Sequence, residues 1–145
     1  MDIRDNFQPY NQYKLLVDYI YNADYNFRHQ DQVMVGELSD ELLNFFPTEV
    51  DGRRYKQHQI NCYTPRSLAL FHTDNGTYKE SLTLIYYPCP TYSLDEGGTT
   101  EIVVDDQIVG VRPICNRALF FDGTLLHRAT PYRTQPRFSI GIKYV

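Results

Sequence analysis

From residue 55 onward, the chain consists of short β-type segments separated by turn residues, without a helical pattern between them. The separators are rich in Pro, Gly, Asp and Asn, as in Asp74-Asn75-Gly76 and Asp105-Asp106. A mainly β fold is therefore expected, and eight short strands at this spacing suggest a jelly-roll barrel or sandwich, with a double-stranded β-helix (jelly roll) as the fold we predict. The predicted strands cover residues 55–63, 67–72, 81–87, 99–104, 107–111, 117–122, 126–130 and 137–144.

The first third of the chain has a different pattern, which predicts two helices. Asn11 is expected to cap a first helix that ends near Asn22, and Ser39 starts a second helix that Pro47 ends. Both segments carry apolar residues at helical spacing. The expected apolar faces contain Leu15, Leu16, Tyr19 and Ile20 in the first helix, and Leu42, Leu43, Phe45 and Phe46 in the second.

The chain is expected to form a single domain over residues 1–145. Residues 1–54 would supply helical support for one sheet, and residues 55–145 would form the jelly-roll core. Within the ambiguous stretch 24–36, Val33-Met34-Val35 is a candidate for a short strand. No repeat, low-complexity tract or linker composition divides the chain.

Charge and cysteine content restrict the partners and the compartment. The net charge is −4 and the pI about 5.5, so the chain lacks the basic field that would attract a nucleic-acid backbone. Three widely spaced cysteines without a Cys-x-x-Cys pair disfavour a disulfide framework and a zinc site. The start of the chain has no secretory pattern, and no stretch is long and apolar enough for a membrane span. A cytoplasmic, reducing environment is expected.

The most specific grouping is His72-Thr73-Asp74 together with His127. Two residues apart in an extended chain, His72 and Asp74 would point to the same face. Two imidazoles and one carboxylate are the ligands that hold non-heme Fe(II) on one side and leave the other open. A chance His-x-Asp is the alternative, and His29 and His58 are interpreted as ordinary histidines. The position of the pair and of His127 at the ends of predicted strands favours the metal site.

The last predicted strand carries Arg137, Ser139 and Gly141 on one face and apolar residues on the other. Its apolar face must be buried. Either the arginine faces solvent, or it points into the barrel and needs a carboxylate partner, because an unpaired buried charge is costly. The metal-type grouping favours the second arrangement.

Over about residues 55–145, these features together resemble the Fe(II)/2-oxoglutarate-dependent dioxygenases, and among them the prolyl-4-hydroxylase-like branch. Tyr63 lies nine residues before His72, and residues 96–100 (Glu-Gly-Gly-Thr-Thr) resemble the family's Gly-Gly turn. The run 82–87 (Leu-Thr-Leu-Ile-Tyr-Tyr) resembles a core strand that ends in a co-substrate tyrosine. An Arg-x-Ser pair at Arg137 follows the last histidine by ten residues, as in the common family ending.

The resemblance implies specific roles for these residues. The iron ligands would be His72, Asp74 and His127. Residues that bind the 2-oxoglutarate co-substrate would be Arg137, Ser139, Tyr63 and Tyr87, the last preferred over Tyr86 because it ends its strand. Arg66, in a turn where many relatives have glycines, is a candidate substrate contact whose alternative is an ordinary solvated turn residue.

The resemblance also implies a reaction. Fe(II), 2-oxoglutarate and O2 would support hydroxylation of a C–H bond with release of succinate and CO2. A peptidyl proline is the leading substrate expectation, with a protein or peptide as partner, and small molecules stay open. The alternatives are a non-catalytic jelly-roll binding module, or a cupin-type metalloenzyme with a different co-substrate.

Overall fold

The computed structural model describes residues 1–74 and 80–145, which form eleven strands and three helices. The strands are β1 (Asp2–Arg4), β2 (Asn26–Arg28), β3 (Val33–Gly36), β4 (Glu49–Val50), β5 (Arg53–Tyr63), β6 (Leu82–Tyr87), β7 (Thr100–Val104), β8 (Gln107–Val111), β9 (Arg117–Asp122), β10 (His127–Ala129) and β11 (Arg137–Tyr144). The helices are α1 (Tyr10–Ile20), α2 (Asp40–Leu43) and the 3-10 helix η1 (Leu94–Glu96).

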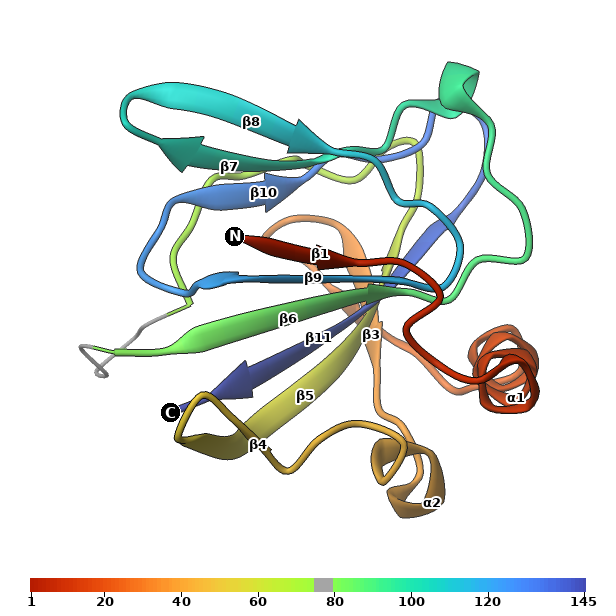
Figure 1. Ribbon diagram of the computed structural model, residues 1–145. Helices are drawn as coiled ribbons and strands as arrows, with labels where there is room; N and C mark the ends of the chain where they lie inside the picture. The colour runs from red at the N-terminus through yellow and green to blue at the C-terminus, as the bar shows by residue number, and fades with distance from the viewer. Residues whose placement is uncertain (75–79) are drawn as a thin grey trace.

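Two antiparallel sheets give the jelly roll that the strand pattern predicts. In the eight-stranded sheet the order is β1-β9-β6-β11-β5-β3-β2, with β4 paired to β5. The smaller sheet has the order β10-β7-β8 and lies over one face of the larger sheet, whereas α1 and α2 lie on the other side (Figure 1). The strands of the large sheet therefore have one face toward the helices and one toward the small sheet.

The alternation of β11 decides which side chains reach each layer. Ile140, Ile142 and Tyr144 are buried in a core shared with the two helices. Arg137, Ser139, Gly141 and Lys143 occupy the alternate positions and line a cavity on the opposite face. The helix side of this core comes from Leu16, Ile20, Leu38, Leu42 and Phe46. A second apolar cluster, between the sheets, contains Tyr87, Cys89, Ile102, Val111, Leu119 and Phe121.

Both predicted helices form, with different boundaries. Ser39 caps α2 as expected, because its side chain accepts a hydrogen bond from the backbone N–H of Leu42. The expected cap at Asn11 is wrong: α1 begins at Tyr10, its N-cap residue is Pro9, and no side chain caps it. Leu16 and Ile20 are buried as expected, but Leu15 is half exposed.

One predicted strand, 67–72, does not form. Ser67 closes a turn with Thr64, and Leu68 donates its N–H to the carbonyl of Asp31. Only His72 makes strand-like contact, through two backbone hydrogen bonds with His127. The segment is apolar, and its composition therefore predicted a core strand, but its leucines are exposed. The expected turn Asp74-Asn75-Gly76 extends beyond the described residues.

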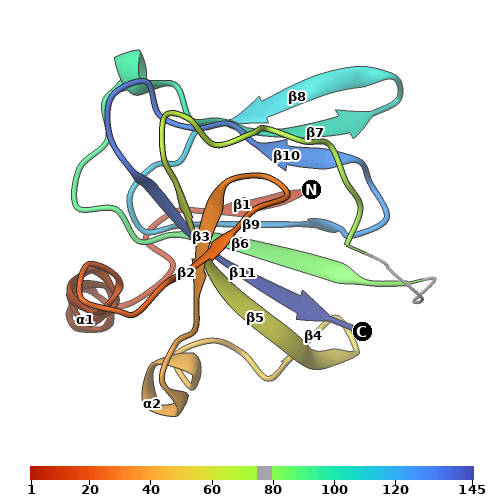
Figure 2. The ribbon, with the colours of Figure 1, turned by 180° about the vertical axis from the view of Figure 1, so that it is seen from behind.

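The N-terminal third supplies strands as well as the expected helices. The candidate strand at residues 33–35 is confirmed as β3, which pairs with β5 and with the short strand β2. In the view from behind, the β2–β3 hairpin projects over the large sheet (Figure 2). At the other edge β1 pairs with β9, and Arg117 of β9 forms a 2.7 Å ion pair with Asp5.

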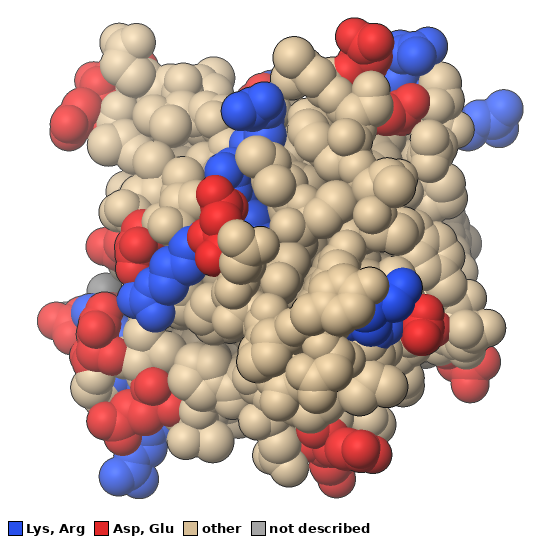
Figure 3. Space-filling model, turned by 45° about the vertical axis from the view of Figure 1, so that its right-hand side comes forward, with Lys and Arg blue, Asp and Glu red and all other residues tan. Residues whose placement is uncertain are grey.

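Charged side chains on one face of the molecule form no broad field of one sign. Figure 3 shows a short diagonal line in which basic and acidic side chains alternate, beside a wide area of uncharged side chains. Separately, none of the helices in residues 1–74 and 80–145 has the length and apolar character needed to cross a membrane.

Candidate functional site

The site is a cavity of about 490 Å³ between the large sheet and the segment around residues 68–74. Its floor follows from the strand register. β11 lies between β5 and β6, so Ser139 has Asn61 beside it, and Gly141 lies between Gln59 and Ile85. Cavities of this size accommodate small organic ligands.

His72, Asp74 and His127 come together at one wall of this cavity. Their ligand atoms all lie within 4.8 Å of one another. Nε2 of His72 is 3.5 Å from Asp74 Oδ1, and Nε2 of His127 is 3.2 Å from Asp74 Oδ2. The backbone bridge between His72 and His127 holds the two histidines at this spacing although they are distant in sequence.

Backbone carbonyls set the orientation of both imidazole rings. Nδ1 of His72 lies 3.0 Å from the carbonyl oxygen of Leu70, and Nδ1 of His127 lies 2.9 Å from that of Leu125. Because a carbonyl oxygen only accepts, the hydrogen must be on Nδ1 in each ring. Nε2 of each ring then faces Asp74 and is the nitrogen that a metal ion could bind. This is the arrangement by which an outer carbonyl fixes the tautomer of a metal-binding histidine.

Asp74 is held as a carboxylate by its neighbours. Burial raises the pKa of this carboxyl group, but the contact with His127, the hydrogen bond from Thr83 and the nearby His72 outweigh burial and lower the pKa below its usual value. Thr83 of β6 donates a 2.9 Å hydrogen bond to Asp74 Oδ2. An ionised acceptor between two Nε2 atoms suits a divalent cation.

Arg137 is a fully buried cation on the same cavity. Its Nε donates a 2.7 Å hydrogen bond to the carbonyl of Gly98, and Nη2 donates a 2.9 Å bond to Thr100 Oγ1. The guanidinium carbon lies 5.6 Å from the ring centre of Tyr63 and 5.5 Å from that of Tyr87. The side chain is thus fixed between two aromatic rings.

This guanidinium has an unused donor. Nη1 of Arg137 is buried and has no hydrogen-bond partner among residues 1–74 and 80–145, and no carboxylate of those residues forms an ion pair with it. A buried charge without an anion is costly, and a guanidinium recognises carboxylates through paired N–H groups. The position therefore suits an organic acid that enters the cavity.

The remaining predicted site residues differ in their placement. Ser139 and Tyr63 line the cavity and are buried. Tyr87 is fully buried beside Arg137, and its hydroxyl lies 2.6 Å from Thr100 Oγ1, whereas Tyr86 points to the helix side and donates to Asn116. Arg66 is exposed on the Thr64–Ser67 turn and does not line the cavity, so the fold does not bring it to the site.

Sequence reasoning missed the residues that support this arrangement. Thr83 holds Asp74, and Thr100 and the Gly98 carbonyl hold Arg137. Thr83 shares a strand face with Ile85 and Tyr87, which is a signal that it would face the site. The contact from Gly98 is made by a backbone carbonyl, which no residue pattern identifies.

Comparison with known families agrees with this geometry. The family model described as "2OG-Fe(II) oxygenase superfamily" matches residues 51–144, about two thirds of the chain. The chain belongs to this superfamily. It is therefore a 2-oxoglutarate-dependent dioxygenase that uses Fe(II) and O2, and the resemblance seen in the sequence is confirmed. No curated protein sequence matches the oxygenase.

Solved structures share the fold of the oxygenase at low identity. A prolyl hydroxylase from Trichoplax adhaerens, in complex with a hypoxia inducible factor peptide fragment, has a TM-score of 0.72 and 17% identity, covering 99% of this chain and 82% of its own. A Pseudomonas putida prolyl-4-hydroxylase has a TM-score of 0.77 and 12% identity, with 99% and 90% covered. HygX from Streptomyces hygroscopicus, solved with nickel, 2-oxoglutarate and hygromycin B bound, has a TM-score of 0.69 and 13% identity. The match covers 98% of this chain and 81% of HygX.

The residues of the oxygenase fit both cofactors of the superfamily. His72, Asp74 and His127 offer two imidazole Nε2 atoms and a carboxylate, a donor set suited to Fe(II). Arg137 offers an unsatisfied buried N–H for the carboxylate of a dicarboxylic keto acid. Both lie on one cavity, so metal and keto acid could be held together.

Proposed function

We propose that the oxygenase hydroxylates a C–H bond of a peptidyl proline, with His72, Asp74 and His127 as iron ligands and Arg137 as the anchor of 2-oxoglutarate. The observation that supports the assignment most strongly is the buried Nη1 of Arg137, which lacks a partner within the described residues and lies on the cavity that the three ligand candidates line. Without the keto acid, this charge would have no anion among residues 1–74 and 80–145.

The chemistry that Fe(II) supplies when bound is the oxidation of C–H to C–OH by O2, coupled to conversion of 2-oxoglutarate into succinate and CO2. The contribution of the chain is placement. Arg137 fixes one end of the keto acid, and Ser139, Tyr63 and Tyr87 are proposed to add hydrogen bonds along it. Burial raises the pKa of Tyr87 although Arg137 opposes this, so its hydroxyl keeps its proton and can donate.

Exclusion of water is the second contribution. Ile85 lines the cavity, and Leu119 and Phe121 are buried beside it on the neighbouring strand β9. In such a dry environment the charge-assisted bond of Arg137 is stronger than it would be in water. A substrate that closes the open side of the cavity would complete the exclusion of solvent.

A peptide carrying proline is proposed as the substrate because the fold is similar to prolyl hydroxylases, one of which was solved with a peptide fragment. An extended peptide also suits a cavity that opens along a strand, and proline-rich segments are already extended when free. Free amino acids and larger small molecules are the competing substrates, and the assay includes both.

The test is an anaerobic thermal-shift experiment with Mn(II), with and without 2-oxoglutarate, on the parent chain and on Arg137→Ala. A ligand bound only by the folded state adds about 2.7 kcal/mol at a concentration of one hundred times Kd. We expect the keto acid to raise the Tm of the parent and not that of Arg137→Ala. Equal shifts in both would refute the assignment of Arg137.

Succinate formation in air, with Fe(II), then tests the substrate. Proline-containing peptides, free L-proline and hygromycin B are compared as stimulants of turnover in the parent. Stimulation by peptides, with a mass increase of a single oxygen atom on proline, is the expected result. Stimulation by the free amino acid or the small molecule alone would refute a peptidyl substrate and leave the oxygenase assignment intact.

A further inference from the structure

A row of amide side chains on β5 lines the cavity and extends away from Arg137. Gln57, Gln59 and Asn61 occupy alternate positions of β5 and all face the cavity. Asn61 pairs with Ser139, beside the proposed keto-acid site, and Gln59 and Gln57 follow along β5 in the direction away from Tyr63 and Arg137. Iron and keto acid would therefore leave Gln59 and the far side of Asn61 uncovered.

Two of these amides present unused hydrogen-bonding groups. Gln59 Nε2 donates to Asn61 Oδ1 at 2.5 Å. Within the described parts of the chain, this bond leaves the Asn61 NH2 group and Gln59 Oε1 without a partner. The pair thus presents one free NH2 group as donor and one free carbonyl oxygen as acceptor. Exchanging O and N in both amides would again leave one NH2 group and one oxygen free. A peptide group, with one C=O and one N–H, has the complementary set.

The spacing of the row also matches a peptide. Alternate residues of a strand are roughly 7 Å apart, so the amides of β5 repeat at that interval. An extended peptide beside β5 repeats its own peptide groups, in the same orientation, at nearly the same interval. A compact ligand such as a free amino acid has no such repeat.

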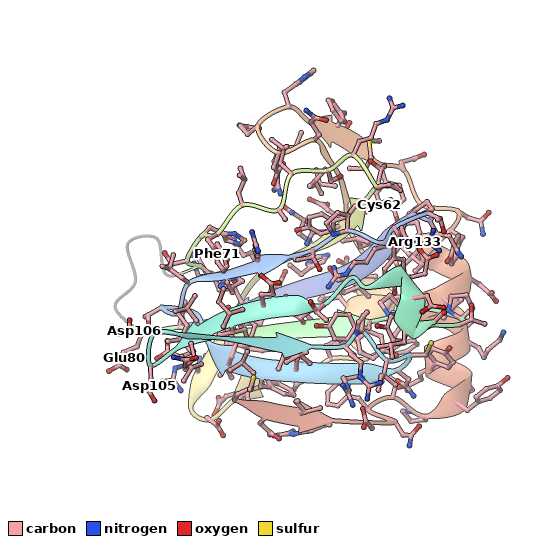
Figure 4. All side chains as sticks on the ribbon, turned by 90° about the horizontal axis from the view of Figure 1, so that it is seen from above. Cys62, Phe71, Glu80, Asp105, Asp106 and Arg133 are labelled. Atoms are coloured by element: carbon pink, nitrogen blue, oxygen red, sulfur yellow. The ribbon has the colours of Figure 1, made fainter. Side chains whose placement is uncertain are left out.

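The segment 68–71 adds exposed apolar side chains to the cavity, beside the Arg28–Asp31 ion pair. Leu68, Leu70 and Phe71 line the cavity, yet they are 42%, 53% and 37% exposed. Figure 4 shows Phe71 on the connection that passes β10, and the guanidinium of Arg128 lies 4.3 Å from the centre of its ring. Apolar side chains held open at a cavity rim are suited to cover apolar parts of a ligand.

Gly141 leaves room between the two sides. A methyl group at this position would meet Ile85 Cδ1 at 3.7 Å and Asn61 Nδ2 at 3.8 Å, which are ordinary contacts. Close packing in the protein therefore does not require glycine here. Its lack of a side chain keeps the floor open beside Asn61, where a substrate residue would lie.

We infer that Gln59 and Asn61 form a subsite that binds the backbone of an extended peptide, whose apolar side chains rest on Leu68, Leu70 and Phe71. This inference rests on the proposed function and names its substrate-binding residues. The amides fix the register of the peptide through its N–H and C=O groups. Gly141 gives access to the side chain that is presented to the metal.

The test uses the double variant Gln59→Met/Asn61→Leu, which keeps the approximate volume of both side chains and removes their hydrogen bonds. Gln107→Met is the matched control, because Gln107 is exposed on β8 in the other sheet. The probe is a fluorescein-labelled, amidated peptide with one central proline flanked by Val and Thr residues, which favour the extended two-residue repeat and keep their N–H groups. Its anisotropy is measured under argon with the Mn(II)- and 2-oxoglutarate-loaded proteins. Each protein is first checked for the keto-acid thermal shift.

We expect the double variant to bind the peptide roughly tenfold more weakly or worse, since two hydrogen bonds are lost, while its keto-acid shift and the control stay unchanged. Gly141→Val should also weaken the peptide, because its side chain fills the space beside Asn61 while both amide groups stay in the chain. Equal peptide affinity in parent and double variant, or a parent that does not bind the peptide, would overturn the subsite. A parent without a keto-acid shift would instead overturn the proposed function. Should the double variant unfold, Gln59→Met alone gives the same comparison.

Discussion

Arg137 Nε donates a 2.7 Å hydrogen bond to the carbonyl of Gly98, so the turn before β7 fixes the buried cation. Gly98 has a φ of +71°, and a Cβ there would lie 2.3 Å from the ring of Tyr132. The glycine is thus required both for the backbone conformation and for space. Any side chain at this position would displace the turn that holds Arg137.

Gly98→Ala is therefore expected to destabilise the fold by about 2 kcal/mol or more, from positive φ and overpacking together, and to weaken 2-oxoglutarate binding. Gly52→Ala is the matched control, because Gly52 has a φ of +77° with nothing within 4 Å. The free energy of unfolding of Gly52→Ala should fall by only about 1–2 kcal/mol, and this variant should keep keto-acid binding. Urea unfolding and the anaerobic thermal shift measure both effects; equal losses in the two variants would contradict the role of Tyr132.

Thr83→Val tests the support of Asp74. The substitution keeps the shape of the side chain but removes the 2.9 Å hydrogen bond to Asp74 Oδ2. Loss of an outer contact of this kind typically weakens metal binding by about 10–100-fold. We expect such a loss in a Mn(II) titration followed by Tm. Thr48→Val, at an exposed position, should bind Mn(II) like the parent; an unchanged affinity in Thr83→Val would show that Asp74 orients itself without Thr83.

Tyr87→Phe and Tyr86→Phe separate two adjacent buried hydroxyls. Tyr87 is hydrogen-bonded to Thr100, which also accepts from Arg137, whereas Tyr86 donates to Asn116 on the helix side. One lost bond of this kind is worth about 1 kcal/mol. Tyr87→Phe should weaken 2-oxoglutarate binding several-fold, and Tyr86→Phe should lower stability and leave binding unchanged. The reverse pattern in calorimetric titrations would assign the co-substrate to Tyr86.

Cys115 is expected to be the most reactive thiol. Cys89 donates an S–H hydrogen bond of 3.0 Å to Cys115, and this bond lowers the pKa of Cys115, whereas burial raises the pKa of Cys62 to about 11. Because the thiolate is the reactive form, iodoacetamide at neutral pH should label Cys115 at least roughly tenfold faster than Cys62. Peptide mass mapping of brief labelling checks this. Preferential labelling of Cys62, which is buried, would contradict the expected order.

Part of this site could be predicted because the last core strand, β11, alternates between an apolar and a polar face. In β11, a buried apolar face and a polar face predicted that Arg137 and Ser139 share one side, and they do. The segment 67–72 failed for the opposite reason. Its apolar residues Leu68 and Leu70 face a cavity rather than a core, and composition does not distinguish the two.

The short strands of the N-terminal third lacked a local signal. β1 is three residues long and exposed, and its pairing partner β9 lies more than a hundred residues later. In the site, the metal-ligand candidates His72, Asp74 and His127 had a sequence signal, but the residues that support them did not. Support from Thr83 and from the Gly98 carbonyl arises only when distant strands meet in register.

Equilibrium dialysis of Fe(II) under argon, with and without 2-oxoglutarate, tests the central claim most directly. The account predicts that the parent retains a single equivalent of Fe(II) and binds it more tightly when the keto acid is present. Asp74→Ala should retain almost none, while Arg137→Ala should retain the metal but lose the effect of the keto acid. Retention of Fe(II) by Asp74→Ala at the parent's affinity would contradict the assignment of the metal site.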